Sequence, residues 1–233
     1  MIEEFRRIYQ NNETVLTEID LLEENYSSTN AIQLYTRDSF ICRTINQIVR
    51  SGDVNLMFKI RHILNDIYLH LKQSYVQIHS SYYYPPYEIF YRGQLISNDE
   101  LNYFKENQGN IISMKTFLST TTSMQIALMY AGKYFENSDL TSVIFTIERN
   151  SALQTRPYTN ISAYSLFPDE EEILFALGSF FRIGNIRVMP DDEHIFITAV
   201  DDVPEFWISR DIPWDIVIPS ILPHYSTFDV SSL

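Results

Sequence analysis

Cysteine is nearly absent from this sequence of 233 residues, which contains only Cys42. A disulfide within the chain is therefore excluded, and with it the disulfide-stapled class of small secreted domains. Cys42 lies in an apolar pattern of helical spacing, so we expect it in the core rather than as a nucleophile. This cysteine usage favours a reducing compartment.

Long hydrophobic runs are also missing, because no stretch of about 18 apolar residues occurs in the sequence. Residues 1–7 lack the apolar segment that a signal peptide needs. We therefore expect neither a signal peptide nor a membrane span, and we predict a cytoplasmic protein. A secreted or injected effector would show the same pattern, so that alternative stays open.

Positive charge is scarce, since 17 Lys and Arg stand against 30 Asp and Glu, a formal net charge of -13. This charge opposes attraction to phosphate backbones and anionic membrane surfaces, so we expect no nucleic acid and no membrane as partners. The histidines show no metal-ligand spacing with a cysteine or carboxylate, which predicts that no metal is bound. They are His62, His70, His79, His194 and His224.

Glycine is sparse and aromatic residues are frequent, with 6 Gly against 16 Tyr and 15 Phe. This composition favours ordered strands and aromatic-lined clefts over linkers. With 45% hydrophobic residues the chain can bury its own core, and we expect a monomer. The apolar spacing divides the chain into a helical lead (1–79), a core (80–203) and an irregular, proline-interrupted C-terminal tail (204–233).

Apolar periodicity predicts the elements within these parts. The expected helices span residues 31–49, 54–79, 97–105 and 124–135. The expected strands span residues 87–94, 111–118, 143–147, 173–176, 180–183 and 195–200.

Three adjacent carboxylates, Glu170, Glu171 and Glu172, run directly into an apolar strand. If the strand extends back through them, alternation places Glu170 and Glu172 on one face and Glu171 on the other. Two carboxylates a single pleat apart repel each other, so their burial requires a proton, a cation or hydroxyl donors. The stretch belongs either to a reaction site or to a solvated loop.

Two further features give weak signals when each is taken alone. Arg92 ends a predicted strand beside Gly93, where the guanidinium can meet a phosphate, although a strand-end arginine is usually a surface ion pair. Hydroxyl residues 119–123 lie between a predicted strand and a predicted helix. Such runs are more often helix caps than catalytic groups.

Together and in this order, the three features resemble the arginine-serine-glutamate class of mono-ADP-ribosyltransferases, which includes bacterial toxins and animal arginine-specific enzymes. Tyr91-Arg92-Gly93 matches the first motif, and Phe117-Leu118-Ser119-Thr120-Thr121 matches the second. The third motif is an aromatic followed by x-x-E-x-E and two aliphatics, which residues 167–174 match. Thr121 departs from the usual serine but keeps a hydroxyl. The resemblance covers roughly residues 30–200.

The resemblance implies an α+β fold, in which two packed, mostly antiparallel β-sheets form an NAD cleft behind the helical lead. It implies a catalytic core at residues 80–203 that cleaves the nicotinamide-ribose bond, with NAD as co-substrate. Arg92 would then hold the NAD phosphate, and the backbone of Gly93 would meet the nicotinamide amide. The resemblance also implies that Thr120 and Thr121 are among the residues that bind NAD.

The family's catalytic roles fall on two carboxylates and one hydroxyl. Ser119 would orient Glu172, which would bind the nicotinamide-ribose hydroxyl and stabilise an oxocarbenium-like transition state. Glu170 would bind the acceptor guanidinium and assist its deprotonation. Family members that modify other acceptors usually have glutamine at that position, so the resemblance implies an acceptor protein with an accessible arginine.

Two flanking residues complete the predicted site. Phe167 either stacks on the acceptor guanidinium or anchors its loop. Arg156, in the polar loop before the third motif, is a candidate for a phosphate contact.

Two other functions remain open from the sequence. In an NAD glycohydrolase, water would replace the acceptor, because an accessible oxocarbenium also reacts with solvent. Alternatively, a domain of this fold could bind NAD or a partner without catalysis.

Overall fold

The computed structural model describes residues 1–37, 39–79, 85, 87–132, 139–165, 168–188 and 194–202. Its α-helices are α1 (Ile2–Ile8), α2 (Glu13–Asn25), α3 (Ala31–Thr36), α4 (Phe40–Ser51), α5 (Val54–Lys59), α6 (Arg61–His79), α7 (Asn98–Glu106) and α8 (Met124–Ala131). Its strands are β1 (Tyr87–Ser97), β2 (Ile111–Met114), β3 (Leu118–Thr121), β4 (Leu140–Asn150), β5 (Tyr158–Asn160), β6 (Glu172–Phe175), β7 (Ser179–Val188) and β8 (Ile195–Asp201). Short 3-10 turns are η1 (Ser28–Asn30) and η2 (Pro168–Glu170). The predicted tail, 204–233, lies outside the described residues.

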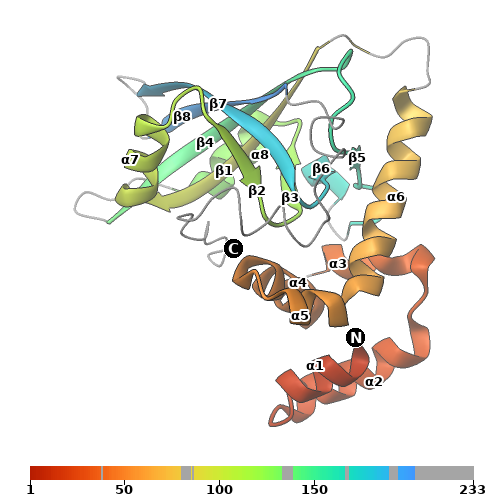
Figure 1. Cartoon of the computed structure of the whole chain (residues 1–233). Coiled ribbons are helices and arrows are strands. Elements are labelled where there is room, and N and C mark those ends of the chain that lie inside the picture. Colours follow the sequence, from red (N-terminus) through yellow and green to blue (C-terminus); the bar gives the residue numbers. More distant parts are fainter. Residues whose placement is uncertain are drawn as a thin grey trace.

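The helical lead lies on one side of the molecule and the strands on the other (Figure 1). Buried apolar side chains of the lead form a core with residues of the sheet region, among them Phe117, Ile161 and Leu174. The lead is therefore packed directly on the strands that carry the second and third motifs. Within the described residues, no helix has the length and apolar character to cross a membrane.

The expected single helix over residues 31–49 is wrong, because the chain breaks between α3 and α4. Arg37 has an extended backbone, with φ -69° and ψ 141°, and Ser39 is extended as the N-cap of α4. Apolar spacing continues across the break since both helices bury residues in the same core. The expected helix over 54–79 is likewise interrupted, at Ile60 between α5 and α6.

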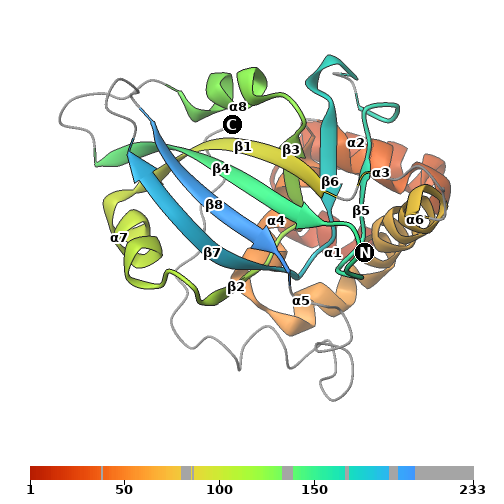
Figure 2. The same ribbon diagram turned by 90° about the horizontal axis from the view of Figure 1, so that it is seen from above.

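The strands pair in the order β2-β7-β8-β4-β1-β3-β6-β5. Among the described strands, β4 and β8 run parallel and the other neighbours run antiparallel. The ladder between β1 and β3 consists of the single pair Tyr91 and Thr121. This narrow connection divides the strands into a five-stranded group (β2, β7, β8, β4 and β1) and a three-stranded group (β3, β6 and β5). Figure 2 shows β5 and β6 running across the direction of β1, β4, β7 and β8.

A second core lies between the two groups of strands and contains apolar side chains from both. Phe175 of β6 is central to it, because its ring lies 5.5 Å from that of Phe90 in β1 and 5.6 Å from that of Phe181 in β7. Tyr158 of β5 stacks on Phe175 at 4.9 Å. On the opposite face of the five-stranded group, Ala127 and Ala131 of α8 pack on Ile144.

The predicted strand over 111–118 is two strands, β2 and β3, separated by residues 115–117. β2 pairs with β7, whereas β3 pairs with β6, so the bend carries the chain from one group of strands to the other. As a consequence, Ser119, Thr120 and Thr121 lie within β3 rather than after the end of a strand. The other predicted strands are present, with bounds that differ by a few residues at their ends.

A buried arginine ties the lead to the sheet. The Arg149 side chain of β4 is 0% exposed and lies 3.3 Å from carboxylate oxygens of Glu88 and Asp201. It also donates to the Tyr75 hydroxyl of α6 at 2.5 Å and lies over the Tyr158 ring. A buried guanidinium needs such charged and hydrogen-bonding partners, so this cluster fixes the end of α6 against β1, β4 and β8.

Candidate active site

The three motifs meet because β1, β3 and β6 are neighbours in the strand order. Tyr91 pairs with Thr121 across β1 and β3, and Thr121 pairs with Glu172 across β3 and β6. Ser119 pairs with Leu174 in the same ladder, so Ser119 and Glu172 lie on one face of the three-stranded group. The strand pairing thus places Arg92, the hydroxyl run and Glu172 in one region.

Arg92 is held as a fixed cation at the junction of the two groups of strands. Its Nη1 donates to the backbone carbonyl of Ser119 at 2.7 Å, and its Nε donates to Oε1 of Gln94 at 2.9 Å. Burial lowers the pKa of Arg92 to about 10, against the opposing effects of Tyr35 and Glu172. The guanidinium is charged at neutral pH, and its orientation does not depend on a ligand.

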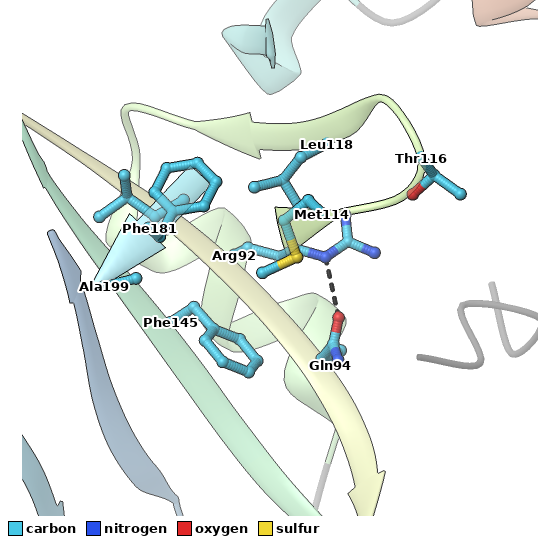
Figure 3. A pocket seen from close by; sticks show the side chains of 9 residues that line it. Arg92, Gln94, Met114, Thr116, Leu118, Phe145, Phe181 and Ala199 are labelled. Atoms are coloured by element: carbon cyan, nitrogen blue, oxygen red, sulfur yellow. Dashed lines mark hydrogen bonds between the residues drawn. The ribbon is translucent and has the colours of Figure 1, made fainter. Parts of the chain in front are cut away.

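A pocket beside Arg92 opens between the two groups of strands (Figure 3). Its walls are mainly apolar and include Leu118, Phe145 and Phe181. Gln94 is 8% exposed, and in the described structure its Nε2 has no hydrogen-bond partner. A buried amide donor without a partner is costly unless a ligand satisfies it. The pocket thus holds a cation and an unsatisfied donor among apolar walls, on the side of β3 that carries Leu118 and not Ser119.

Glu172 is partly buried at the first position of β6. Burial raises the pKa of its carboxyl, and the charge of Glu170 raises it further. A hydrogen bond from Ser119 and the charge of Arg92 act in the opposite direction. Ser119 therefore contacts the carboxylate that the resemblance implied for it, and this contact favours the charged form of Glu172.

This arrangement predicts how Ser119→Ala changes the pH profile of NAD cleavage. Loss of the hydroxyl removes a contact that lowers the Glu172 pKa, so the acidic limb of kcat/KM for nicotinamide release should move to higher pH. The measurement is kcat/KM against pH for both proteins. Ser123→Ala, which removes the N-cap of α8 instead, is the matched control. An acidic limb that stays in place in Ser119→Ala would contradict the assignment.

The three carboxylates do not form one extended strand. Residues 168–170 form the 3-10 turn η2, and β6 begins at Glu172. Glu171 between them has φ 48°, the left-handed region that a non-glycine residue adopts only rarely. Simple alternation therefore does not determine where Glu170 lies, because the backbone turns between the two acids.

Three hydroxyls hold this turn, from β3, from the residue that follows it and from α8. Thr121 donates to the backbone carbonyl of Glu170 at 2.8 Å, and Thr122 donates to Oε2 of Glu171. Tyr130 donates to Oε1 of Glu170. The position of Glu170 is thus fixed through its own backbone, its own carboxylate and its neighbour.

The remaining predicted site residues have varied surroundings. Thr120 is buried and donates its hydroxyl to the carbonyl of Ile173 at 3.0 Å, so that hydroxyl proton is used within the sheet. Arg156 is 7% exposed in the segment leading into β5, which is separated from β3 by β6. Phe167 lies outside the described residues. Their roles toward NAD or the acceptor stay predictions.

Gly93 is required by the packing of α8 on β1. A Cβ atom at Gly93 would lie 1.7 Å from the carbonyl oxygen of Ala127 and 2.6 Å from the backbone nitrogen of Ala131. Both contacts are with helix backbone, which cannot move as a side chain does. The glycine of the first motif therefore has a structural reason besides the predicted contact with nicotinamide.

Gly93→Ala is expected to lower the free energy of unfolding. Overpacking a core costs roughly 1–3 kcal/mol, and we expect at least this loss here. Unfolding in urea measures the effect. Gly184→Ala is the milder comparison, because its Cβ would meet the Thr198 side chain at 3.0 Å. Equal stability of Gly93→Ala and the wild type would show that α8 does not pack on β1 this closely.

The sequence reasoning missed residues that the helical lead brings to the site. Tyr35 of α3 is buried, and its hydroxyl donates to Asn46 of α4 at 3.0 Å. Burial raises the pKa of Tyr35 well above 10, and the charges of Glu172 and Arg92 act on it in opposite directions. Arg50 of α4 lies close enough to lower the Arg92 pKa. The available signal was Asn46 and Arg50, polar residues four apart and therefore on one side of α4.

Solved structures with the same fold are bacterial ADP-ribosyltransferases. HopU1 of Pseudomonas syringae pv. Tomato matches with a TM-score of 0.56 and 16% identity, covering 86% of this chain and 87% of that one. Plx2a from Paenibacillus larvae matches with a TM-score of 0.55 and 15% identity, covering 85% and 95%. Vis toxin from Vibrio splendidus matches with a TM-score of 0.51 and 20% identity, covering 75% and 73%. The fold class predicted from the sequence, α+β with mostly antiparallel strands, is confirmed.

A family model described as NAD:arginine ADP-ribosyltransferase matches residues 9–203. The chain belongs to this family, and the resemblance seen in its three motifs is confirmed. Like other members, it is an NAD-dependent ADP-ribosyltransferase with NAD as co-substrate. A search of curated proteins gave no significant match.

Proposed function

We propose that this protein transfers ADP-ribose from NAD to arginine side chains of an acceptor protein and releases nicotinamide. The observation that carries the proposal is Glu170, a carboxylate whose charge acts on Glu172 and whose position is fixed by Thr121 and Tyr130. A preorganised carboxylate beside the catalytic one suits a guanidinium acceptor. Vis, one of the similar structures, was solved in complex with agmatine, a small guanidinium compound.

The residues present can divide the reaction between them. Arg92 binds a phosphate of NAD, and the backbone of Gly93 meets the nicotinamide amide. Glu172, oriented by Ser119, binds the ribose hydroxyl. As the nicotinamide-ribose bond breaks, its electron pair leaves with nicotinamide, and the carboxylate stabilises the positive charge that develops at the ribose carbon.

Glu170 acts on the acceptor in the second half of the reaction. It binds the guanidinium and accepts a proton as an acceptor nitrogen forms the new bond to the ribose carbon. Water can attack the same carbon, so we propose NAD hydrolysis as a slower side reaction. The single cysteine of the chain suits an enzyme that works in a reducing compartment, and we propose the cytoplasm.

Incubation of the protein with NAD and agmatine, analysed by mass spectrometry, tests the proposal. We expect an ADP-ribosyl-agmatine adduct, with nicotinamide equal to the sum of the adduct and the free ADP-ribose from the side reaction. Arginine-rich proteins extend the test, with modified residues located by fragmentation. Free ADP-ribose and nicotinamide without an adduct, across a range of guanidinium acceptors, would show a glycohydrolase instead.

A further inference from the structure

We propose that Tyr130 of α8 is a positioning residue that sets the orientation of Glu170 for the acceptor guanidinium. The inference rests on the proposed function, because it assigns a role within the same site. Tyr130 donates its hydroxyl to Oε1 of Glu170, from a helix that none of the three motifs includes. This contact leaves Oε2 of Glu170 to meet the guanidinium.

The hydroxyl of Tyr130 is a permanent donor in this contact. Burial raises its pKa to about 12, and the charges of Glu170 and Glu172 contribute to the increase. The phenol therefore stays protonated at neutral pH. Because the charge of Glu172 also acts on it, Tyr130 lies near both catalytic carboxylates.

The helix that carries Tyr130 is itself rigidly placed. Its backbone packs directly on Gly93 of β1, with no room for a Cβ atom. At its N-terminus the Ser123 side chain accepts from Ile126, and the backbone nitrogen of Ser123 donates to the Thr121 hydroxyl at 3.0 Å. The same Thr121 hydroxyl donates to the Glu170 carbonyl. Tyr130 and Glu170 therefore share one support, which is the condition for a preorganised pair.

The Tyr130 side chain also reaches the surface, since the residue is 38% exposed and its neighbour Met129 is 80% exposed. Tyr130→Phe keeps the aromatic ring and removes only the bond to Glu170, so it isolates the positioning role from apolar contact.

The test compares steady-state kinetics of wild type, Tyr130→Phe and the control Met129→Ala with NAD and agmatine. We expect Tyr130→Phe to raise KM for agmatine about ten-fold, the effect of losing a hydrogen bond to a charged group. KM for NAD and nicotinamide release without acceptor should stay unchanged. Met129→Ala should match the wild type, and thermal melting should show equal folding of all three.

The possible failures are distinguishable. If wild type forms the agmatine adduct and Tyr130→Phe has the same KM for agmatine, the positioning role is overturned and the proposed function stands. If Tyr130→Phe loses nicotinamide release in parallel with transfer, its role is general support of the site, which also overturns the inference. If wild type forms no adduct with agmatine, both the proposed function and the inference fall.

Discussion

Glu172→Gln is expected to lower both ADP-ribose transfer and NAD cleavage by about 100- to 1000-fold, the usual loss when one preorganised electrostatic group is removed. Both reactions pass through the same positive charge on the ribose, and glutamine cannot offset it. Nicotinamide release and adduct formation, followed in parallel, measure the effect. Asp169→Asn, an exposed carboxylate in the adjacent turn η2, is the control. A loss confined to transfer would contradict the assignment.

The same substitution should stabilise the folded protein at neutral pH. The pKa of Glu172 is higher in the folded protein than its unfolded value of 4.5. The contribution of this group to stability is therefore fully present below pH 4.5 and is lost as the pH rises through the folded-state pKa. Above that point the wild type holds a poorly solvated charge that glutamine lacks. At neutral pH the Glu172→Gln variant should therefore melt at a higher temperature than the wild type, and in acid the two melting temperatures should converge. The difference at neutral pH measures the stability that the wild type loses by holding a functional charge.

Glu170→Gln is expected to separate the two activities. Transfer to agmatine should fall by about 100-fold or more, because general-base assistance and the charge-assisted contact to the guanidinium are both lost. Hydrolysis of NAD should remain within a few-fold of wild type. Its acidic limb should move to lower pH, since the charge of Glu170 raises the Glu172 pKa.

Glu171→Gln is the matched control for this separation. Glutamine keeps an oxygen that can accept from Thr122, so the turn between the two acids should hold and both activities should persist. Equal losses of transfer and hydrolysis in Glu170→Gln would refute the division of roles. If Glu170→Gln and Glu171→Gln lowered transfer to agmatine equally, the acceptor would have no specific contact with Glu170.

Much of this site was accessible from the sequence because the motif residues sit on strands. Once β1, β3 and β6 are neighbours, strand pairing alone brings Ser119 and Glu172 to one face. The order of those strands came from the structure, because periodicity does not encode it and the resemblance implied only the class of fold. The departure at Thr121 proved informative, because its hydroxyl holds the Glu170 carbonyl.

The remainder depended on local backbone and long-range packing. The left-handed backbone of Glu171 leaves no sequence signal, since glycine or asparagine is the usual mark of that conformation. The break between α3 and α4, which brings Tyr35 to Asn46, is hidden by unbroken apolar spacing. Tyr130 lies eleven residues after Ser119 on a helix that reads as ordinary core packing, and only its tertiary position reveals the contact with Glu170.

The single pair between β1 and β3 has a consequence for the geometry of the cleft. Because so little backbone hydrogen bonding joins the two groups of strands, the angle between them is set by the rings behind the site. Phe175 touches Phe90 and Phe181 on one side and Tyr158 on the other. We expect the volume of the Phe175 ring to set the distance between the two groups of strands. We therefore expect substitutions at Phe175 to change the fit of the co-substrate from within the buried core.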